Sequence, residues 1–258
     1  MAGHSKWANI KRQKARVDAK KGKIFARLSR AMIVAARQGV PDPDANFQLR
    51  SAIEKAKAAG IPNDNIERAI AKGSGQSGQD GESWEAIRYE GYGPGGVAVL
   101  IEAFTDNRNR TAADLRAAFS KQDGNLGETG CVGWMFAQKG VITLAYTGDE
   151  DALLEALLET SAESYELLDP EEEEDDRAVE VYCESDRLEQ VSQGLEQLGY
   201  TIQDNELRWI PKNLTEVTDT DQARRLLKLI DTLEDLDDVQ SVNANFDIPL
   251  DLLARLGS

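Results

Sequence analysis

The chain has 258 residues and a mass of 28.4 kDa, and its 41% of apolar residues exclude general disorder and leave room for two or three domains with apolar cores. No stretch approaches the roughly 20 apolar residues of a membrane span, and the N-terminus lacks the apolar core of a secretion signal. We therefore expect a cytoplasmic protein with no membrane contact.

Charge is distributed unevenly along the chain, whose formal net charge is −16. Residues 1–80 hold 16 Lys and Arg against 7 Asp and Glu, a net charge of +9, whereas residues 81–258 hold 14 against 39, a net charge of −25. Any polyanionic partner must therefore be met by the first part of the chain.

The N-terminal segment is the most basic part of the sequence. Between Gly3 and Arg30 there are ten Lys and Arg and a single acid, Asp18. Residues 20–37 have a helical period that places these basic residues on one face: Lys20, Lys23, Arg27, Arg30 and Arg37. The opposite face is apolar: Ile24, Phe25, Leu28, Met32, Ala35 and Ala36.

Two further helices are predicted before the first linker. Asp42 and Pro43 have the pattern of an N-cap followed by proline at the first helical position, and the helix ends at Gly60. A third, short helix follows Pro62 and ends before Gly73. We therefore predict a basic helical domain over residues 1–72 and a flexible linker over residues 73–83, "GSGQSGQDGES".

Beyond the linker the pattern changes to short strands that alternate with helices of ten to fifteen residues. This order predicts small α+β sandwiches with helices on one face of each sheet. Residues 137–211 are predicted to form a unit inserted into a domain made of residues 84–136 and 212–258. The predicted fold class is therefore multidomain α+β, in which a helical domain precedes two ferredoxin-like sandwiches, one inserted in the other.

The sequence contains no pattern that singles out a catalytic centre, a cofactor or a metal. "GYGPGG" formally matches the G-x-G-x-x-G fingerprint of dinucleotide sites, but a strand rather than a helix follows it, so we interpret it as a tight turn. The single histidine, His4, has no partner that could orient it, and Cys131 and Cys183 are far apart. The acidic run at residues 171–176 is interpreted as a solvated loop. We therefore predict no enzyme activity, cofactor, metal or small-molecule ligand.

A face with charge of one sign favours nucleic acid as the partner, since solubility alone is achieved with mixed charges. Trp7 could stack on an unpaired base or pack on the protein's own body. In "TDNRNRT", Arg108 and Arg110 precede a predicted helix with its N-cap near Thr111, where they could hold a phosphate or pair with local acids.

Several segments together resemble the YebC family, which includes the mitochondrial translational activator of cytochrome c oxidase. They are "AGHSKWANIKRQKARVDAKKGK", "DNIERAIAKGSG", "YEGYGPGGVA", "TDNRNRTAADLR", "GNLGETGCVGWMF" and "LEDLDDVQSVNANFDI". The resemblance implies a helical domain followed by two α+β domains, the third inserted in the second, and no catalysis. It implies regulation through DNA or action on the ribosome in translation. The chain departs from the family in Cys131, where serine is expected, and in "QGVPDPD", where a Gly-Gly pair is usual.

We therefore predict a non-enzymatic regulator of gene expression that binds DNA or ribosomal RNA through its basic helical domain, with the ribosome as a candidate partner. The alternative is an acidic protein–protein adaptor without direct nucleic-acid contact. The residues expected to contact nucleic acid are Lys6, Trp7, Lys11, Arg12, Lys14, Lys20, Lys23, Arg27, Arg30, Arg108 and Arg110.

Overall fold

The computed structural model describes residues 21–75, 84–146, 148–168 and 177–257. Two units can be distinguished: Ala137–Ile210, called here the inserted unit, and a larger one that contains the described residues up to Phe136 and those from Pro211 onward. A helical N-terminal region precedes mixed α and β structure, which confirms the multidomain α+β fold class. Within the described ranges, no helix is long and apolar enough to cross a membrane.

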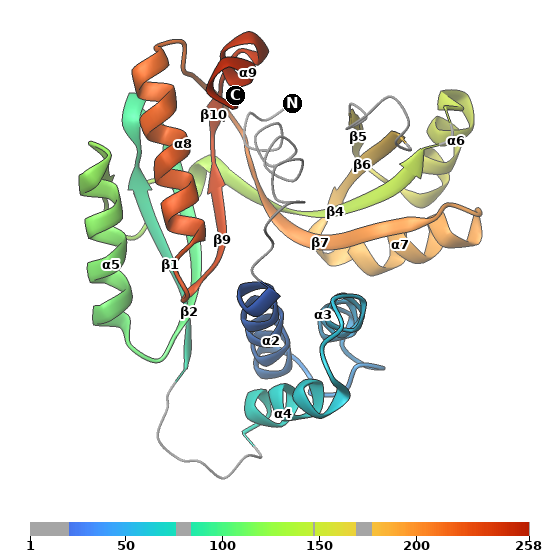
Figure 1. Cartoon of the computed structure of the whole chain (residues 1–258). Coiled ribbons are helices and arrows are strands. Elements are labelled where there is room, and N and C mark those ends of the chain that lie inside the picture. Colours follow the sequence, from blue (N-terminus) through green and yellow to red (C-terminus); the bar gives the residue numbers. More distant parts are fainter. Residues whose placement is uncertain (1–20, 76–83, 147, 169–176, 258) are drawn as a thin grey trace. The chain divides into compact units, whose positions relative to one another are not determined.

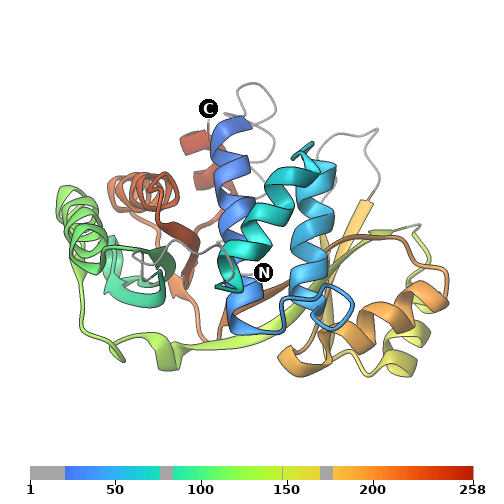
Figure 2. The same cartoon turned by 90° about the horizontal axis from the view of Figure 1, so that it is seen from below.

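Three helices form the N-terminal region: α2 (Lys21–Gln38), α3 (Phe47–Ala58) and α4 (Asn63–Gly73). Figure 2 shows them, coloured blue to cyan, as a small bundle. Each contributes one apolar side to a common core: Met32, Ile33, Ala36, Leu49, Ile53, Ala56, Ile66 and Ala69. The bundle thus follows from the helical spacing of these residues in the sequence.

The predicted start of the second helix is wrong. Asp42 does not cap it; its carboxylate accepts a hydrogen bond from the backbone N–H of Asp44, and the helix begins only at Phe47. The N-cap is Asn46, whose side-chain oxygen accepts from Leu49 N while its amide group donates to the carbonyls of Ala35 and Val40. An asparagine can do both because it carries a donor and an acceptor, and it thereby ties α3 to the end of α2.

The larger unit also contains a four-stranded sheet in the order β3-β1-β2-β9. Its strands are β1 (Glu85–Tyr92), β2 (Ala98–Thr105), β3 (Asn125–Leu126) and β9 (Val239–Ala244), and all neighbours are antiparallel. Helices α5 (Arg108–Lys121) and α8 (Thr220–Glu234) lie on one side of the sheet in Figure 1. Short β8 (Thr215–Glu216) and β10 (Phe246–Asp247) pair in parallel, and α9 (Leu250–Gly257) follows.

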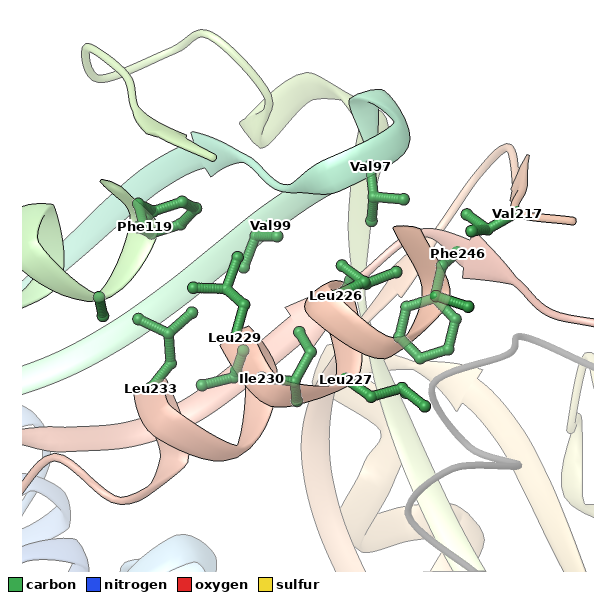
Figure 3. Close-up of a cluster of buried hydrophobic side chains, with 14 of the residues drawn as sticks. Val97, Val99, Phe119, Val217, Leu226, Leu227, Leu229, Ile230, Leu233 and Phe246 are labelled. Atoms are coloured by element: carbon green, nitrogen blue, oxygen red, sulfur yellow. The ribbon is translucent and has the colours of Figure 1, made fainter. Parts of the chain in front are cut away.

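Apolar side chains of α8 form the centre of this domain. Figure 3 shows Leu226, Leu229 and Leu233 directed toward Val99 of the sheet and Phe119 of α5. The same cluster includes residues from both parts of the interrupted domain, among them Ile101, Val242 and Phe246. Burial of this cluster is therefore what joins the two chain segments.

The segment "GYGPGG" is a turn, as predicted. It joins the antiparallel strands β1 and β2 through a short 3-10 turn at Pro94–Gly96. Gly95 and Gly96 have φ of 75° and 74°, a backbone region that side chains with a Cβ rarely adopt. No α-helix follows the glycines, so the geometry of a dinucleotide site is not present here.

The inserted unit contains β4 (Phe136–Tyr146), α6 (Glu150–Thr160), β5 (Ser164–Leu168), β6 (Arg177–Glu184), α7 (Leu188–Gln197) and β7 (Ile202–Pro211). Its sheet order is β5-β6-β4-β7, which is the connectivity of a ferredoxin-like fold. In the other sheet a direct hairpin joins the two central strands, so the strands are arranged similarly but connected differently. The sequence interpretation missed β5, whose pattern "SYELL" is short and lies beside the acidic run.

Helix α6 carries a matched pair of leucines that tests its packing. Leu153 is fully buried, and Leu158, also on α6, is 82% exposed. We expect Leu153→Ala to lower the free energy of unfolding by about 2–5 kcal/mol, because it leaves a cavity in the core. Leu158→Ala should change it by less than about 0.5 kcal/mol. Urea denaturation of both variants measures the difference, and an equal loss in the two would contradict this packing of α6.

Candidate nucleic-acid interface

Helix α2 has no acidic residue anywhere along its length. Burial increases along it: Ile24 is exposed, Phe25 and Leu28 are half-buried, and Met32 and Ala36 are buried. Ile24 belongs to the apolar face in the sequence but is exposed in the structure, because the bundle core begins further along the helix. In the N-terminal half of α2, Arg27 lies on the less buried part of the bundle.

Of the predicted contact residues on α2, Arg27 is exposed and Arg30 is half-buried. Neither has an acidic partner among the residues that the structure describes. Lys23 also lies in α2, but its side chain is outside the described set. The remaining predicted contacts of the N-terminal segment lie outside the described residues: Lys6, Trp7, Lys11, Arg12, Lys14 and Lys20.

The helical region is basic beyond α2. Residues 21–75 hold ten Lys and Arg against five Asp and Glu. Some of these cations also have local contacts: Arg50 donates to the carbonyl of Pro43 at 2.9 Å and lies over the Phe47 ring, and Arg68 donates to Asn65. These contacts orient the side chains, and the acceptors named here carry no charge.

An aromatic pair connects the helical region to the first sheet. Trp84 stacks on Phe104 with 5.1 Å between ring centroids, and Phe104 is buried in the same cluster as the core of the helices. Arg37 donates a hydrogen bond to the carbonyl of Trp84, and the Lys72 ammonium lies 4.7 Å from the Trp84 ring centroid. Arg37 and Lys72 thus anchor the helices to this aromatic pair, whereas Arg27 remains on the exposed surface.

The second predicted phosphate site lies at the start of α5 and differs from the prediction in its boundary. The helix begins at Arg108, and its N-cap is Asn107, whose side chain accepts from Arg110 N, so both arginines lie in the first turn rather than before it. Arg108 is exposed, with a guanidinium nitrogen 3.7 Å from a carboxylate oxygen of Glu85. Arg110 pairs with two carboxylates: Asp106 at 2.8 Å and Asp238 at 2.9 Å.

Asp238 is the buried acceptor of this network. Its carboxylate accepts from the hydroxyls of Thr105 and Thr111 and from Arg110. Burial by itself would raise the pKa of Asp238, but the hydrogen bonds and the charge of Arg110 outweigh it, and the net shift of the pKa is downward. The carboxylates of Asp238 and Asp106 in turn raise the pKa of Arg110. The anion beside Arg110 is thus supplied by the chain itself.

The Asp238 network makes a prediction about stability and pH. Because the pKa of Asp238 is lower in the folded than in the unfolded chain, its contribution is complete above about pH 4 and is lost as the pH falls through the native value. Asp238→Asn should lower the free energy of unfolding by about 1–3 kcal/mol at pH 7 and by less at pH 3. Urea denaturation at the two pH values measures this.

The neighbouring exposed residue supplies the control: Asp237→Asn should leave the free energy of unfolding nearly unchanged at both pH values. A loss for Asp238→Asn that is equally large at pH 3 and pH 7 would contradict the assigned ionisation.

A buried carboxylate that the sequence interpretation missed fixes a second loop. Glu90 accepts hydrogen bonds from the backbone N–H groups of Gly130, Val132 and Gly133, at 2.9, 2.7 and 2.7 Å. Burial would raise the pKa of Glu90, but these three donors reverse the shift, and the pKa is lowered. The loop presents Trp134, which is 63% exposed. The closely spaced glycines of "GETGCVGW" were the available signal for such a tight loop.

The described residues contain no group of three or more His, Cys, Asp and Glu side chains that could hold a metal. Cys183 is buried, and burial raises its pKa to about 11, while burial also raises the pKa of Cys131. Both are therefore thiols rather than reactive thiolates at neutral pH. His4 lies outside the described residues.

Division of the chain by units places nearly all of the net negative charge in one of them. The inserted unit, residues 137–210, holds 21 Asp and Glu against 4 Lys and Arg, a net charge of −17. The rest of the chain holds 25 Asp and Glu against 26 Lys and Arg, a net charge of +1. The acidity of this protein is thus a property of the inserted unit.

Fold and charge together define a class: a multidomain α+β protein that joins a basic helical region to two α+β domains. Residues 5–76 match the family described as TACO1/YebC protein N-terminal domain, and residues 84–246 match TACO1/YebC second and third domain. The chain belongs to the TACO1/YebC family.

Relatives match over nearly the whole chain. A probable transcriptional regulatory protein of Nostoc punctiforme is 68% identical over 254 residues, which cover 98% of each chain. One of Microcystis aeruginosa is 69% identical over 253 residues, again 98% of each chain. The crystal structure of a conserved hypothetical protein from Aquifex aeolicus has a TM-score of 0.80 at 44% identity and covers 91% of this chain and 93% of that one.

Proposed function

We propose that this chain is a non-enzymatic regulator of gene expression that acts in the cytoplasm and binds nucleic acid through its basic helical domain. The observation that carries the proposal is α2, a helix of 18 residues without a single acid. Its Arg27 and Arg30 have no acidic partner in the described ranges. The names of the relatives, probable transcriptional regulatory proteins, support the same function.

A helix face of one charge has a physical cost that a polyanion relieves. Like charges along one face repel each other, and most surface helices avoid this by mixing signs. Contact with phosphates replaces the repulsion with attraction and releases condensed counterions, which supplies most of the affinity of non-specific binding. The proposed contacts are therefore with phosphate: Lys6, Lys11, Arg12, Lys14, Lys20, Lys23, Arg27 and Arg30, with Trp7 available for stacking on a base.

Arg108 and Arg110 are proposed as secondary contacts of unequal value. Arg108 is well exposed, and its ion-pair partner among the described residues, Glu85, is 3.7 Å away, so a phosphate could replace that weak pair. Arg110 already has two carboxylates at hydrogen-bond distance. A phosphate near Arg110 would meet Asp106 and Asp238 as well, so we rank Arg108 ahead of it.

The target is either DNA or structured ribosomal RNA. A net charge of −17 in the inserted unit opposes any arrangement in which that unit faces phosphates. A localised contact by the helical domain suffers less from this repulsion than a wrap along duplex DNA, which favours a docking site in folded RNA. A short, shape-driven contact with duplex DNA would satisfy the same constraint.

The basic face predicts how binding depends on salt. Replacing Lys23, Arg27 and Arg30 together by Gln should weaken binding to duplex DNA and reduce the slope of log K against log salt by up to about 0.9 for each lost contact. Fluorescence anisotropy over a salt series measures this slope. The control is Arg224→Gln, an exposed α8 arginine that pairs with Asp221. An unchanged slope in the triple variant would favour the alternative, a protein adaptor without nucleic-acid contact.

Co-sedimentation separates the two targets. The full chain is spun with ribosomes at physiological salt while excess duplex DNA competes for it. Because folded RNA better accommodates the acidic unit, we expect the protein to remain with the ribosomes. Loss to the DNA would instead assign it to transcriptional regulation, and the triple variant of α2 should lose whichever interaction is found.

A further inference from the structure

Helix α6 of the inserted unit has apolar side chains on its outer surface. Leu158 is 82% exposed and Leu154 is 41% exposed, although both are large apolar residues. They are four positions apart, so they lie on the same side of the helix. The core side of α6 is formed by other residues: Leu153, Ala156, Leu157 and Thr160. The two exposed leucines are therefore not part of the buried core side of α6.

The edge strand of the sheet also carries an exposed leucine. Strand β5 is the edge strand, and its Leu167 is 38% exposed. Tyr165, on the same face of β5 as Leu167, donates a hydrogen bond to Glu150 of α6. Leu167 thus lies on the side of the strand that faces α6.

Exposed acidic residues lie beside the two leucines on α6. Asp151, Glu155 and Glu159 are exposed on α6, and none of them has an ion pair with a residue that the structure describes. The α6 face, defined as Leu154 and Leu158 with these three carboxylates, belongs to a unit of net charge −17. An apolar centre with a charged rim is the usual composition of a protein-binding surface.

We propose that the α6 face binds a cationic amphipathic helix of a partner protein, one whose apolar residues cover Leu154 and Leu158 while its Lys or Arg residues pair with the acidic rim. Charge selects this occupant. A second copy would bring two units of −17 together, and nucleic acid or an anionic membrane would present the same sign to Asp151, Glu155 and Glu159. Only a basic partner satisfies both the apolar centre and the rim.

The proposal goes beyond nucleic-acid binding and gives the two charged parts of the chain different partners. Proteins that coat nucleic acid are themselves basic, because they neutralise phosphate. A helical domain that binds phosphates and an acidic unit that binds a basic protein could then act on one nucleoprotein particle. Binding of a partner at the α6 face can be tested without measuring how the helical domain binds nucleic acid.

The test uses the full chain and a synthetic peptide of about 18 residues, long enough to form an isolated helix, with leucines on one face and lysines on the other. A second peptide of the same composition has the order scrambled so that no apolar face forms. Isothermal titration calorimetry at about 0.15 M salt limits the contribution of distant charges. We expect the patterned peptide to bind at least about tenfold more tightly than the scrambled one.

The variant Leu154→Gln/Leu158→Gln should abolish this difference. The matched control, Leu198→Gln/Leu214→Gln, replaces two other exposed leucines and should retain it. Because all four side chains are exposed, the variants are expected to fold, which circular dichroism checks. Equal binding of the two peptides, or patterned binding that survives the α6 variant, would overturn the proposal.

Two further outcomes would assign the face to another occupant and also overturn the proposal. The first is self-association of the wild-type chain in analytical ultracentrifugation that the α6 variant abolishes, which would identify a second copy. The second is tighter binding of a synthetic peptide of residues 1–20 than of the patterned helix, with the same dependence on Leu154 and Leu158. That result would assign the face to the chain's own basic segment.

Discussion

The domain that carries the first sheet is interrupted by the inserted unit, so two distant segments must recognise each other before it can fold. Strand β9 pairs with β2, and the buried side chain of Asn245 accepts a hydrogen bond from Ala98 N at 2.7 Å. The leucines of α8 fill the core between the sheet and α5. Lys212 N donates to the carbonyl of Met135 at 2.8 Å, so the chain enters and leaves the insertion at one place. The core of this domain depends on this closure, because the cost of the closure in chain entropy must be offset by the contacts that it creates.

Charge separation is the second constraint, and it explains how one acidic chain can have a basic front. The unit of −17 is attached through two neighbouring points on the larger one, whose basic helices carry no such excess of acid. Buried carboxylates in the larger unit serve its own backbone and side chains: Glu90 holds a loop, and Asp238 holds Arg110 and two threonines. The charges left on the surface, such as Arg27 and the rim of α6, are those that partners can use.

Local interactions explain where the sequence interpretation failed. Asp42 and Asn46 are both suitable caps, and only the position of α2 decides between them, because Asn46 can also donate to the carbonyl of Ala35. The two arginines of "TDNRNRT" look alike in the sequence. They differ in the structure because Asp238, more than a hundred residues away, reaches Arg110 and not Arg108. Strand β5 was missed since its five residues are too few to show a reliable period.

The sequence by itself determined the order of the longer helices and strands, the turn at "GYGPGG", the family resemblance and the basic front, because periodicity, glycine and charge act over a few residues at a time. The sequence could not determine which charged and polar side chains find partners within the folded chain. Asp238, Glu90 and Asn245 find their partners across long stretches of chain, and the exposure of Leu158 depends on which side of α6 meets the sheet. Only the tertiary structure decides these, since burial and long-range hydrogen bonds exist only once the segments have packed together.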